Sequence, residues 1–207
     1  MESTTFFYFL TASILLTLAP GPDNLYLLTK SLSSGAKSGI ILSAGLASGI
    51  IFHTFLVMVG VAAIIQNSAL AMNLLKIFGA AYLFFLAFKS FQAGQNAKKI
   101  SMNFSDSKEK FFEIYRRGVL MNVLNPKVLL FFLAFLPQFV NFEKSPALQI
   151  IFLGFIFAMQ AFLIFSAIAI FAGRVRKFIL RKKNLGKIFN FVEAAVLAII
   201  AISLIFL

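Results

Sequence analysis

The longest charge-free stretch of this chain lies between Lys37 and Lys76, where no Asp, Glu, Lys or Arg occurs. This stretch has room for more than one membrane-spanning helix, because one such helix needs about 20 predominantly apolar residues. The rest of the 207 residues has the same character, since 60% are hydrophobic and only 13% are charged. Average soluble domains are about 25% charged. A water-soluble fold of this size could not bury so much apolar surface, so the sequence predicts an integral membrane protein.

Six apolar segments are long enough to span a membrane, and they predict a single transmembrane domain over residues 1–207. The segments are Phe6–Leu28, Gly39–Ile65, Ser68–Phe91, Gly118–Val140, Ala147–Gly173 and Ile188–Leu207. A short polar turn at Gln66–Ser68 parts the second from the third. The hydrophilic loops Gln92–Arg117 and Arg174–Lys187 are too short to be domains. We therefore expect an all-α fold of six transmembrane helices.

The basic residues gather on one predicted side of the membrane. Most of the 19 Lys and Arg residues, among them Lys30 and Lys37, follow the first, third and fifth segments. By the positive-inside rule these connections face the cytoplasm, and both termini face outward. The net charge of +12 is then explained by topology and by contact with anionic lipid, so we expect no nucleic-acid partner.

The chain offers few groups for metal or thiol chemistry. It has no cysteine, and His53 is its single histidine. Disulfides, thiolate ligands and multi-histidine sites are therefore excluded. We expect neither a metal site nor a cofactor.

The first predicted helix is interrupted at Ala19–Asn24, where the chain reads Ala-Pro-Gly-Pro-Asp-Asn. The residues Phe6–Ala19 before it give about 21 Å of helix, whereas the hydrocarbon core is about 30 Å thick. The chain is thus still inside the membrane at this motif, and each proline removes a backbone donor. We predict a broken helix, although a kink that only shapes packing is the alternative. The break residues are Pro20, Gly21 and Pro22, and the candidate substrate or coupling residues are Asp23 and Asn24.

The fourth predicted helix has a comparable interruption at Asn122–Lys127. A charge near the centre of a membrane helix costs roughly 3 kcal/mol on insertion scales, so it must face a cavity or a partner. We predict a second broken helix here, with its break at Pro126. Its candidate substrate or coupling residues are Asn122, Asn125 and Lys127. The alternative for Lys127 is that its long side chain extends to the cytoplasmic surface.

The two interruptions occupy corresponding places in two halves of the chain. Pro22 and Asp23 lie in repeat one (about 1–91) where Pro126 and Lys127 lie in repeat two (about 118–207), and the cytoplasmic loop 92–117 joins the repeats. Because each half has three helices, the halves would be inverted in the membrane. Broken helices at matching positions of inverted repeats point to a transporter's binding site. We hypothesise that Asp23 and Lys127 approach each other and that substrate or a proton competes for the pair.

Three further residues of the second segment have two interpretations each. His53 is either a packing and hydrogen-bonding group or a proton relay, since imidazole titrates near neutral pH. Gly45 and Gly49 form a small-xxx-small pair that is typical of close helix packing. The neighbouring helix could belong to the same chain or to a second copy in a homodimer.

The motifs around both breaks resemble the signatures of the LysE/RhtB family of amino-acid exporters. The first is Pro20–Leu25 followed by Gly35, Gly39, Gly45 and Gly49, and the second is Asn125–Lys127 followed by Phe131–Phe139. Gly79–Leu83 also fits the family, and Gly79 is then a helix-packing residue. The resemblance implies a six-helix secondary transporter of the bacterial inner membrane. It would export neutral amino acids or related metabolites by proton antiport, closer to the homoserine, threonine and leucine exporters than to the basic amino-acid branch.

One departure and two alternatives remain beside this resemblance. Glu193 stands near the start of the last helix, where the family usually has small residues, and a salt bridge to the nearby basic loop is its simplest interpretation. The scaffold could also carry another small solute or an ion. An intramembrane enzyme is the remaining class, but Ser48 and His53 are poorly spaced for a catalytic dyad.

Overall fold

The computed structural model describes residues 3–65, 69–96, 109–181 and 185–206. The described elements are α1 (Ser3–Leu18), α2 (Pro22–Ile65), α3 (Ala69–Gln95), α4 (Phe111–Val123), α5 (Pro126–Leu130), the π-helix η1 (Phe131–Phe135), the 3-10 helix η2 (Leu136–Phe139), α6 (Pro146–Arg181) and α7 (Leu185–Phe206). No strand occurs in these ranges, which confirms the all-α class. The expected turn at 66–68 and parts of both expected hydrophilic loops, 97–108 and 182–184, lie outside the described residues.

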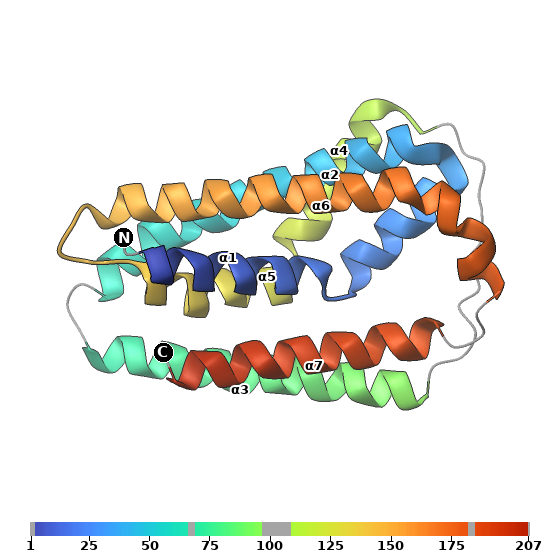
Figure 1. Ribbon diagram of the computed structural model, residues 1–207. Helices are drawn as coiled ribbons and strands as arrows, with labels where there is room; N and C mark the ends of the chain where they lie inside the picture. The colour runs from blue at the N-terminus through green and yellow to red at the C-terminus, as the bar shows by residue number, and fades with distance from the viewer. Residues whose placement is uncertain (1–2, 66–68, 97–108, 182–184, 207) are drawn as a thin grey trace.

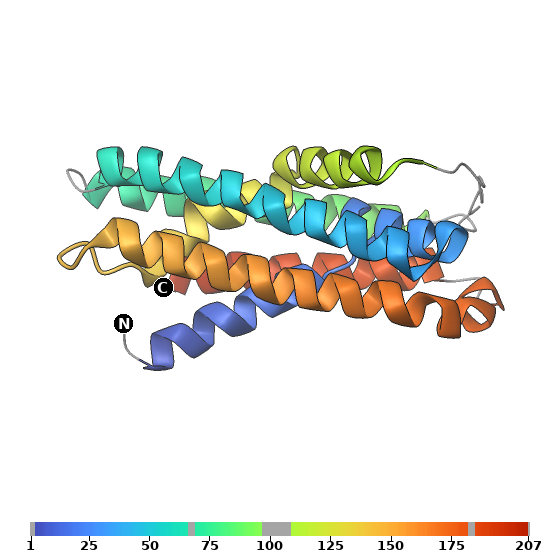
Figure 2. The ribbon, with the colours of Figure 1, turned by 90° about the horizontal axis from the view of Figure 1, so that it is seen from above.

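The helices form a long bundle with two packed groups. Helix α2 packs against α6 and α4, and α3 packs against α7. Helices α1 and α5 lie between these groups in Figure 1, and Figure 2 shows the same bundle from above. Both termini lie at one end of the bundle. The end of α3, the start of α4 and the end of α6 lie together at the other end.

The described helices include several that are long and apolar enough to cross a membrane. Four qualify alone, and a fifth span is the bent pair α4 and α5–η2, whose parts meet at 49°. The first predicted segment, Phe6–Leu28, is divided differently. Its first part is the shorter apolar helix α1, and its second part belongs to α2.

The distribution of polarity is that of a membrane protein. Large apolar side chains cover the outer surface, as at Phe78, which is 68% exposed, and Leu163, which is 60% exposed. Polar and charged side chains are buried inside. These include Thr17, Asp23, His53, Asn122, Asn125 and Lys127. An apolar exterior is stable in lipid, and the buried polar groups must find partners within the protein.

The predicted loop between the first two segments is absent. We expected Lys30 and Lys37 to lie in a connection, but both belong to α2. The chain changes direction at Gly35, whose φ of 86° is in the region that favours glycine. One glycine can therefore turn the chain without a loop.

The hydrophilic connections are also shorter than predicted. Helix α6 extends to Arg181 rather than Gly173, and α4 begins at Phe111 rather than Gly118. Lys and Arg are good helix formers, so a helix continues past the apolar core into a basic segment. Apolar-run length therefore underestimated these helices.

Gly45 and Gly49 of the second segment lie against α4 of the same chain. A Cβ on Gly45 would be 2.2 Å from the backbone oxygen of Tyr115, and one on Gly49 would be 2.7 Å from Cβ of Asn122. A Cβ on Gly118 would be 2.6 Å from the oxygen of Leu42. Glycine thus allows α2 and α4 to approach closely. On α3, a Cβ on Gly79 would be 2.4 Å from Cβ of Ala134.

We predict that Gly118→Ala lowers the free energy of unfolding by about 1–3 kcal/mol, because the added methyl group meets backbone that cannot move without separating α2 from α4. Gly60→Ala is the control, since a Cβ there has no atom within 4 Å. It should be neutral or stabilising by up to about 1 kcal/mol through helix propensity. Thermal unfolding in detergent measures both, and equal effects of the two substitutions would contradict the proposed close contact.

Candidate functional site

The first break is a non-helical turn at residues 19–21, near the middle of the bundle (Figure 1). The backbone carbonyls at the end of α1 are satisfied by side chains from other elements. Asn24 Nδ2 donates to the oxygen of Thr17 at 2.9 Å, and Lys127 Nζ donates to the oxygen of Ala19 at 3.0 Å. Gln160 of α6 donates to the hydroxyl of Thr17 at 2.9 Å. Protein groups thus replace the hydrogen bonds that lipid cannot supply.

The second break separates α4 from α5 at Leu124 and Asn125. Asn125 is the N-cap of α5, because its Oδ1 accepts from the backbone N–H of Lys127 at 3.0 Å. Pro126 takes the first helical position, where its missing N–H leaves no donor unpaired. At the end of α4, the carbonyl of Asn122 lies 3.0 Å from His53 Nε2, which therefore carries the donating proton.

Two side chains of the second break, Asn125 and Lys127, connect it to the first break. Asn125 Nδ2 donates to Oδ2 of Asp23 at 2.7 Å, and Lys127 reaches Ala19 at the end of α1. The charges suit these positions. Asp23 is in the first turn of α2, at the positive end of a helix dipole, and the Lys127 ammonium lies at the negative end of α1.

A small cavity lies where the breaks meet. Its polar lining comes from Thr17, Asp23, Asn24, Asn122 and Lys127, and apolar side chains of α6 close it. Its volume of about 20 Å³ is enough for roughly one water molecule. Asp23 and Lys127 both face this cavity without forming a direct ion pair, and each is only 6% exposed. A buried carboxylate, a buried ammonium and two amides can together bind a small zwitterion.

The remaining candidates from the sequence lie beside this cavity or away from it. Asn125 is buried and bonded to Asp23. His53 does not line the cavity, since its ring packs between Phe52 and Phe132. Ser48 is hydrogen-bonded to Ala44 and Tyr115, so it forms no dyad with His53. Among the described residues, no group of three or more His, Asp or Glu could hold a metal ion.

Glu193 of α7 occupies an unexpected position. Its Oε2 accepts from the Ser90 hydroxyl at 3.0 Å. Most side chains of the basic loop lie outside the part of the chain that the structure describes, so the expected salt bridge stays a prediction. The other oxygen of Glu193 and the Lys127 ammonium lie 3.0 Å and 3.1 Å from the place where a Cβ on Gly21 would be. In the sequence, the only sign of this role was an acidic residue within an apolar helix. Its position along the helix did not reveal which way the Glu193 side chain faces.

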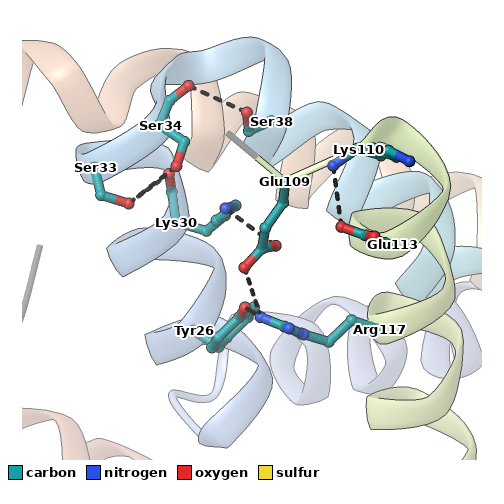
Figure 3. A network of polar contacts seen from close by, with 9 residues as sticks. All are labelled: Tyr26, Lys30, Ser33, Ser34, Ser38, Glu109, Lys110, Glu113 and Arg117. Atoms are coloured by element: carbon teal, nitrogen blue, oxygen red, sulfur yellow. Dashed lines mark hydrogen bonds and ion pairs between the residues drawn. The ribbon is translucent and has the colours of Figure 1, made fainter. Parts of the chain in front are cut away.

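A polar network joins Tyr26 and Lys30 of α2 to Glu109 and Arg117 (Figure 3). Glu109 forms ion pairs with Lys30 at 3.2 Å and with Arg117 at 3.1 Å, and Arg117 also donates to the hydroxyl of Tyr26. The network connects the first part of α2 to the start of α4. Sequence reasoning treated Lys30 only as a topology signal, because Glu109 is distant in the chain.

Between the breaks and the end that holds the termini, the interior is aromatic. Phe9 of α1 contacts Phe131 and Phe139, and Phe157 of α6 contacts Phe131 and Phe132. Phe9, Phe131 and Phe132 are fully buried. Phe157 also lines the cavity, so this aromatic cluster contacts the cavity wall.

Comparisons with known proteins identify a family and relatives of this chain. A family model described as "LysE type translocator" matches residues 14–207. The chain is 29% identical over 179 residues to a homoserine/homoserine lactone efflux protein of Salmonella typhimurium, covering 86% of this chain and 85% of that protein. It is 27% identical over 195 residues to the uncharacterized membrane protein YrhP of Bacillus subtilis, covering 91% and 92%. No solved structure matches the chain.

We predict that Asn125→Ala lowers the free energy of unfolding by about 2–4 kcal/mol, because it removes a helix cap and a hydrogen bond to a buried carboxylate. Asn73→Ala is the matched control, since Asn73 is exposed on α3. Chemical unfolding in detergent compares the two. A loss at Asn125 no larger than that at Asn73 would show that the breaks do not depend on this side chain.

Proposed function

The chain belongs to the LysE type translocator family, and on that premise we propose that it exports neutral amino acids by proton antiport with alternating access. Family membership makes it a transporter of small molecules rather than an enzyme. The observation that carries the substrate class is the cavity between the breaks, where Asp23 and Lys127 offer opposite charges. An α-amino acid presents an ammonium group and a carboxylate that these two side chains can bind. Another small solute on the same scaffold is the alternative.

Homoserine is the first substrate to test. The relative from Salmonella typhimurium carries this compound in its name. The site has no third charged group in its lining, which suits a neutral side chain. The hydroxyl of homoserine could bond to Thr17 or to the amides of Asn24 and Asn122, which already line the cavity.

We propose that the fold consists of two inverted three-helix repeats. The first comprises α1, α2 on both sides of its bend at Gly35, and α3, and the second comprises α4–η2, α6 and α7. Two features support this division. Each half has its break in its first span, and the remaining spans pack in corresponding pairs, α2 with α6 and α3 with α7. The bend at Gly35 supplies the sixth span that length alone did not count.

Alternating access requires each end to open in turn. The cavity has room for roughly one water molecule, so substrate must enter through a different conformation. We propose that the network of Lys30, Glu109, Arg117 and Tyr26 closes the cytoplasmic side. The aromatic cluster around Phe9 and Phe131 closes the outer side.

The orientation in the membrane follows the positive-inside prediction. The connections with most basic residues face the cytoplasm of the bacterial inner membrane, and both termini face outward. Contact of the basic end with anionic lipid and assembly into a homodimer stay predictions. His53 has the proposed role of holding the end of α4 rather than relaying protons, because it faces Asn122 and not the cavity.

We predict that Asp23→Asn reduces homoserine export at least about 100-fold at equal protein abundance, because it removes the carboxylate for the substrate ammonium, an interaction of roughly 3 kcal/mol. Glu143→Gln is the matched control, since it neutralises an exposed acid. Efflux from homoserine-loaded cells with and without the protein measures the effect. Wild-type rates in Asp23→Asn would remove this residue from the site, and no efflux with the wild type would direct the search to other solutes.

We predict that Glu109→Gln opens the cytoplasmic side more often, because the ion pairs of Glu109 with Lys30 of α2 and with Arg117 of α4 are lost. The natural chain has no cysteine, so Ala161→Cys in the cavity wall is a unique reporter. An impermeant thiol reagent added from the cytoplasmic side should label it about fivefold faster, which corresponds to roughly 1 kcal/mol.

Glu113→Gln controls for the loss of a nearby carboxylate. Its carboxylate accepts from the backbone of Lys110 within the first turn of α4 and makes no contact with α2 (Figure 3). Equal labelling rates in Glu109→Gln and Glu113→Gln would argue against the network as a gate.

A further inference from the structure

Lys127 separates the cavity from a second carboxylate, that of Glu193. The Asp23 carboxylate and the Lys127 ammonium line the cavity, whereas Glu193 does not. Glu193 lies beside Gly21 of the first break. Because Gly21 has no side chain, Glu193 Oε1 and Lys127 Nζ can both approach the backbone at this position. Alanine at this position would put its Cβ 3.0 Å from the one and 3.1 Å from the other.

The charges around Lys127 do not balance. Asp23 lines the same cavity as the Lys127 ammonium, and Glu193 Oε1 approaches Lys127 Nζ beside Gly21, so two carboxylates lie near one positive charge. Ser90 of α3 donates a neutral hydrogen bond to Glu193, and the end of α1 contributes only backbone. The nearest lysines along α3 and α7 are directed elsewhere, since Lys89 lies over the ring of Phe85 and Lys187 over that of Phe191. With both acids ionised, this described group carries one net negative charge inside the protein.

An uncompensated charge inside a protein is unfavourable, so this group favours the binding of one more cation. At Asp23 that cation can be the ammonium of a substrate, because Asp23 faces the cavity. At Glu193 the cation must reach a partly buried carboxylate outside the cavity lining, one oxygen of which accepts from Ser90. A proton meets this requirement.

We propose that Glu193 is the proton-binding residue of the transport cycle and that it acts on the substrate through Lys127. When Glu193 is ionised, it shares the ammonium of Lys127, and Asp23 retains negative charge for the substrate. When Glu193 accepts a proton and becomes a neutral carboxylic acid, the ammonium is left to Asp23 alone. An ion pair between Asp23 and Lys127 would then occupy both groups that the zwitterion needs, so proton and substrate exclude each other.

This exclusion has the direction that an exporter needs. A proton taken up from the outer side favours release of the substrate there, and loss of that proton into the cytoplasm restores the site for the next substrate. The inference rests on the proposed exporter function and adds the coupling residue to it. It assigns separate places to substrate and proton, on opposite sides of one lysine.

The first test is homoserine binding to the purified full chain at different pH values. For the wild type, lowering the pH from about 8 to about 5.5 should weaken binding about tenfold, within the usual range of coupling between two sites. Glu193→Gln should bind weakly and without this pH dependence, because a neutral amide imitates the protonated acid and can still accept from Ser90. Glu193→Asp should keep part of the dependence. Wild-type pH dependence in Glu193→Gln would overturn the proposal.

The second test needs no substrate. Acidification of the purified protein should produce an infrared band of a protonated carboxylic acid that is absent in Glu193→Gln and present in the exposed control Glu143→Gln. An unchanged band in Glu193→Gln would overturn the assignment of the proton. If the wild type binds no homoserine but the band depends on Glu193, the exporter proposal fails for this solute while the proton site stands.

Discussion

The absence of hydrogen-bond partners in lipid is the constraint on which this structure depends. Two membrane helices are broken by proline motifs, and each break frees backbone groups that lipid cannot satisfy. The breaks solve this problem together. Lys127 of the second break bonds to the end of α1, and Asn125 bonds to Asp23 in the first turn of α2. Each break thus uses side chains of the other break as well as its own, so the two halves of the chain meet near the middle of the bundle.

The groups that stabilise the breaks are also those that a zwitterionic substrate would need. An ammonium beside a helix C-terminus and a carboxylate beside a helix N-terminus are stable because of the helix dipoles. They remain close enough to the cavity to exchange these partners for a ligand. In the proposed cycle, substrate binding therefore replaces internal contacts rather than filling an empty pocket, which fits a cavity of only about 20 Å³. In the proposal, Glu193 extends the same logic to the proton, because it lies near the same ammonium but outside the cavity lining.

The two ends of the bundle close by different physical means. Aromatic rings around Phe131 pack without direction-dependent charge contacts, whereas the Lys30–Glu109–Arg117 network depends on ion pairs of Glu109 with α2 and with α4. Ion pairs in a partly exposed position are weak and respond to salt and to nearby charge. The proposed cytoplasmic side can thus open at a modest free-energy cost, and the aromatic side is expected to respond mainly to movement of α1 and η1.

Composition and local chemistry decided much of this protein from the sequence alone. Long apolar runs require membrane helices, and prolines inside such a run require a break in the helix. Both requirements depend only on a short segment and the solvent around it. Tertiary structure decided what depends on segments distant in the chain. A single glycine at residue 35 turned an expected loop into a bend, and the partner of Lys30 came from Glu109. The inward direction of Glu193 depends on how α7 packs against α3 and the break, and helical periodicity in a nearly uniform apolar segment carries too little contrast to define that face.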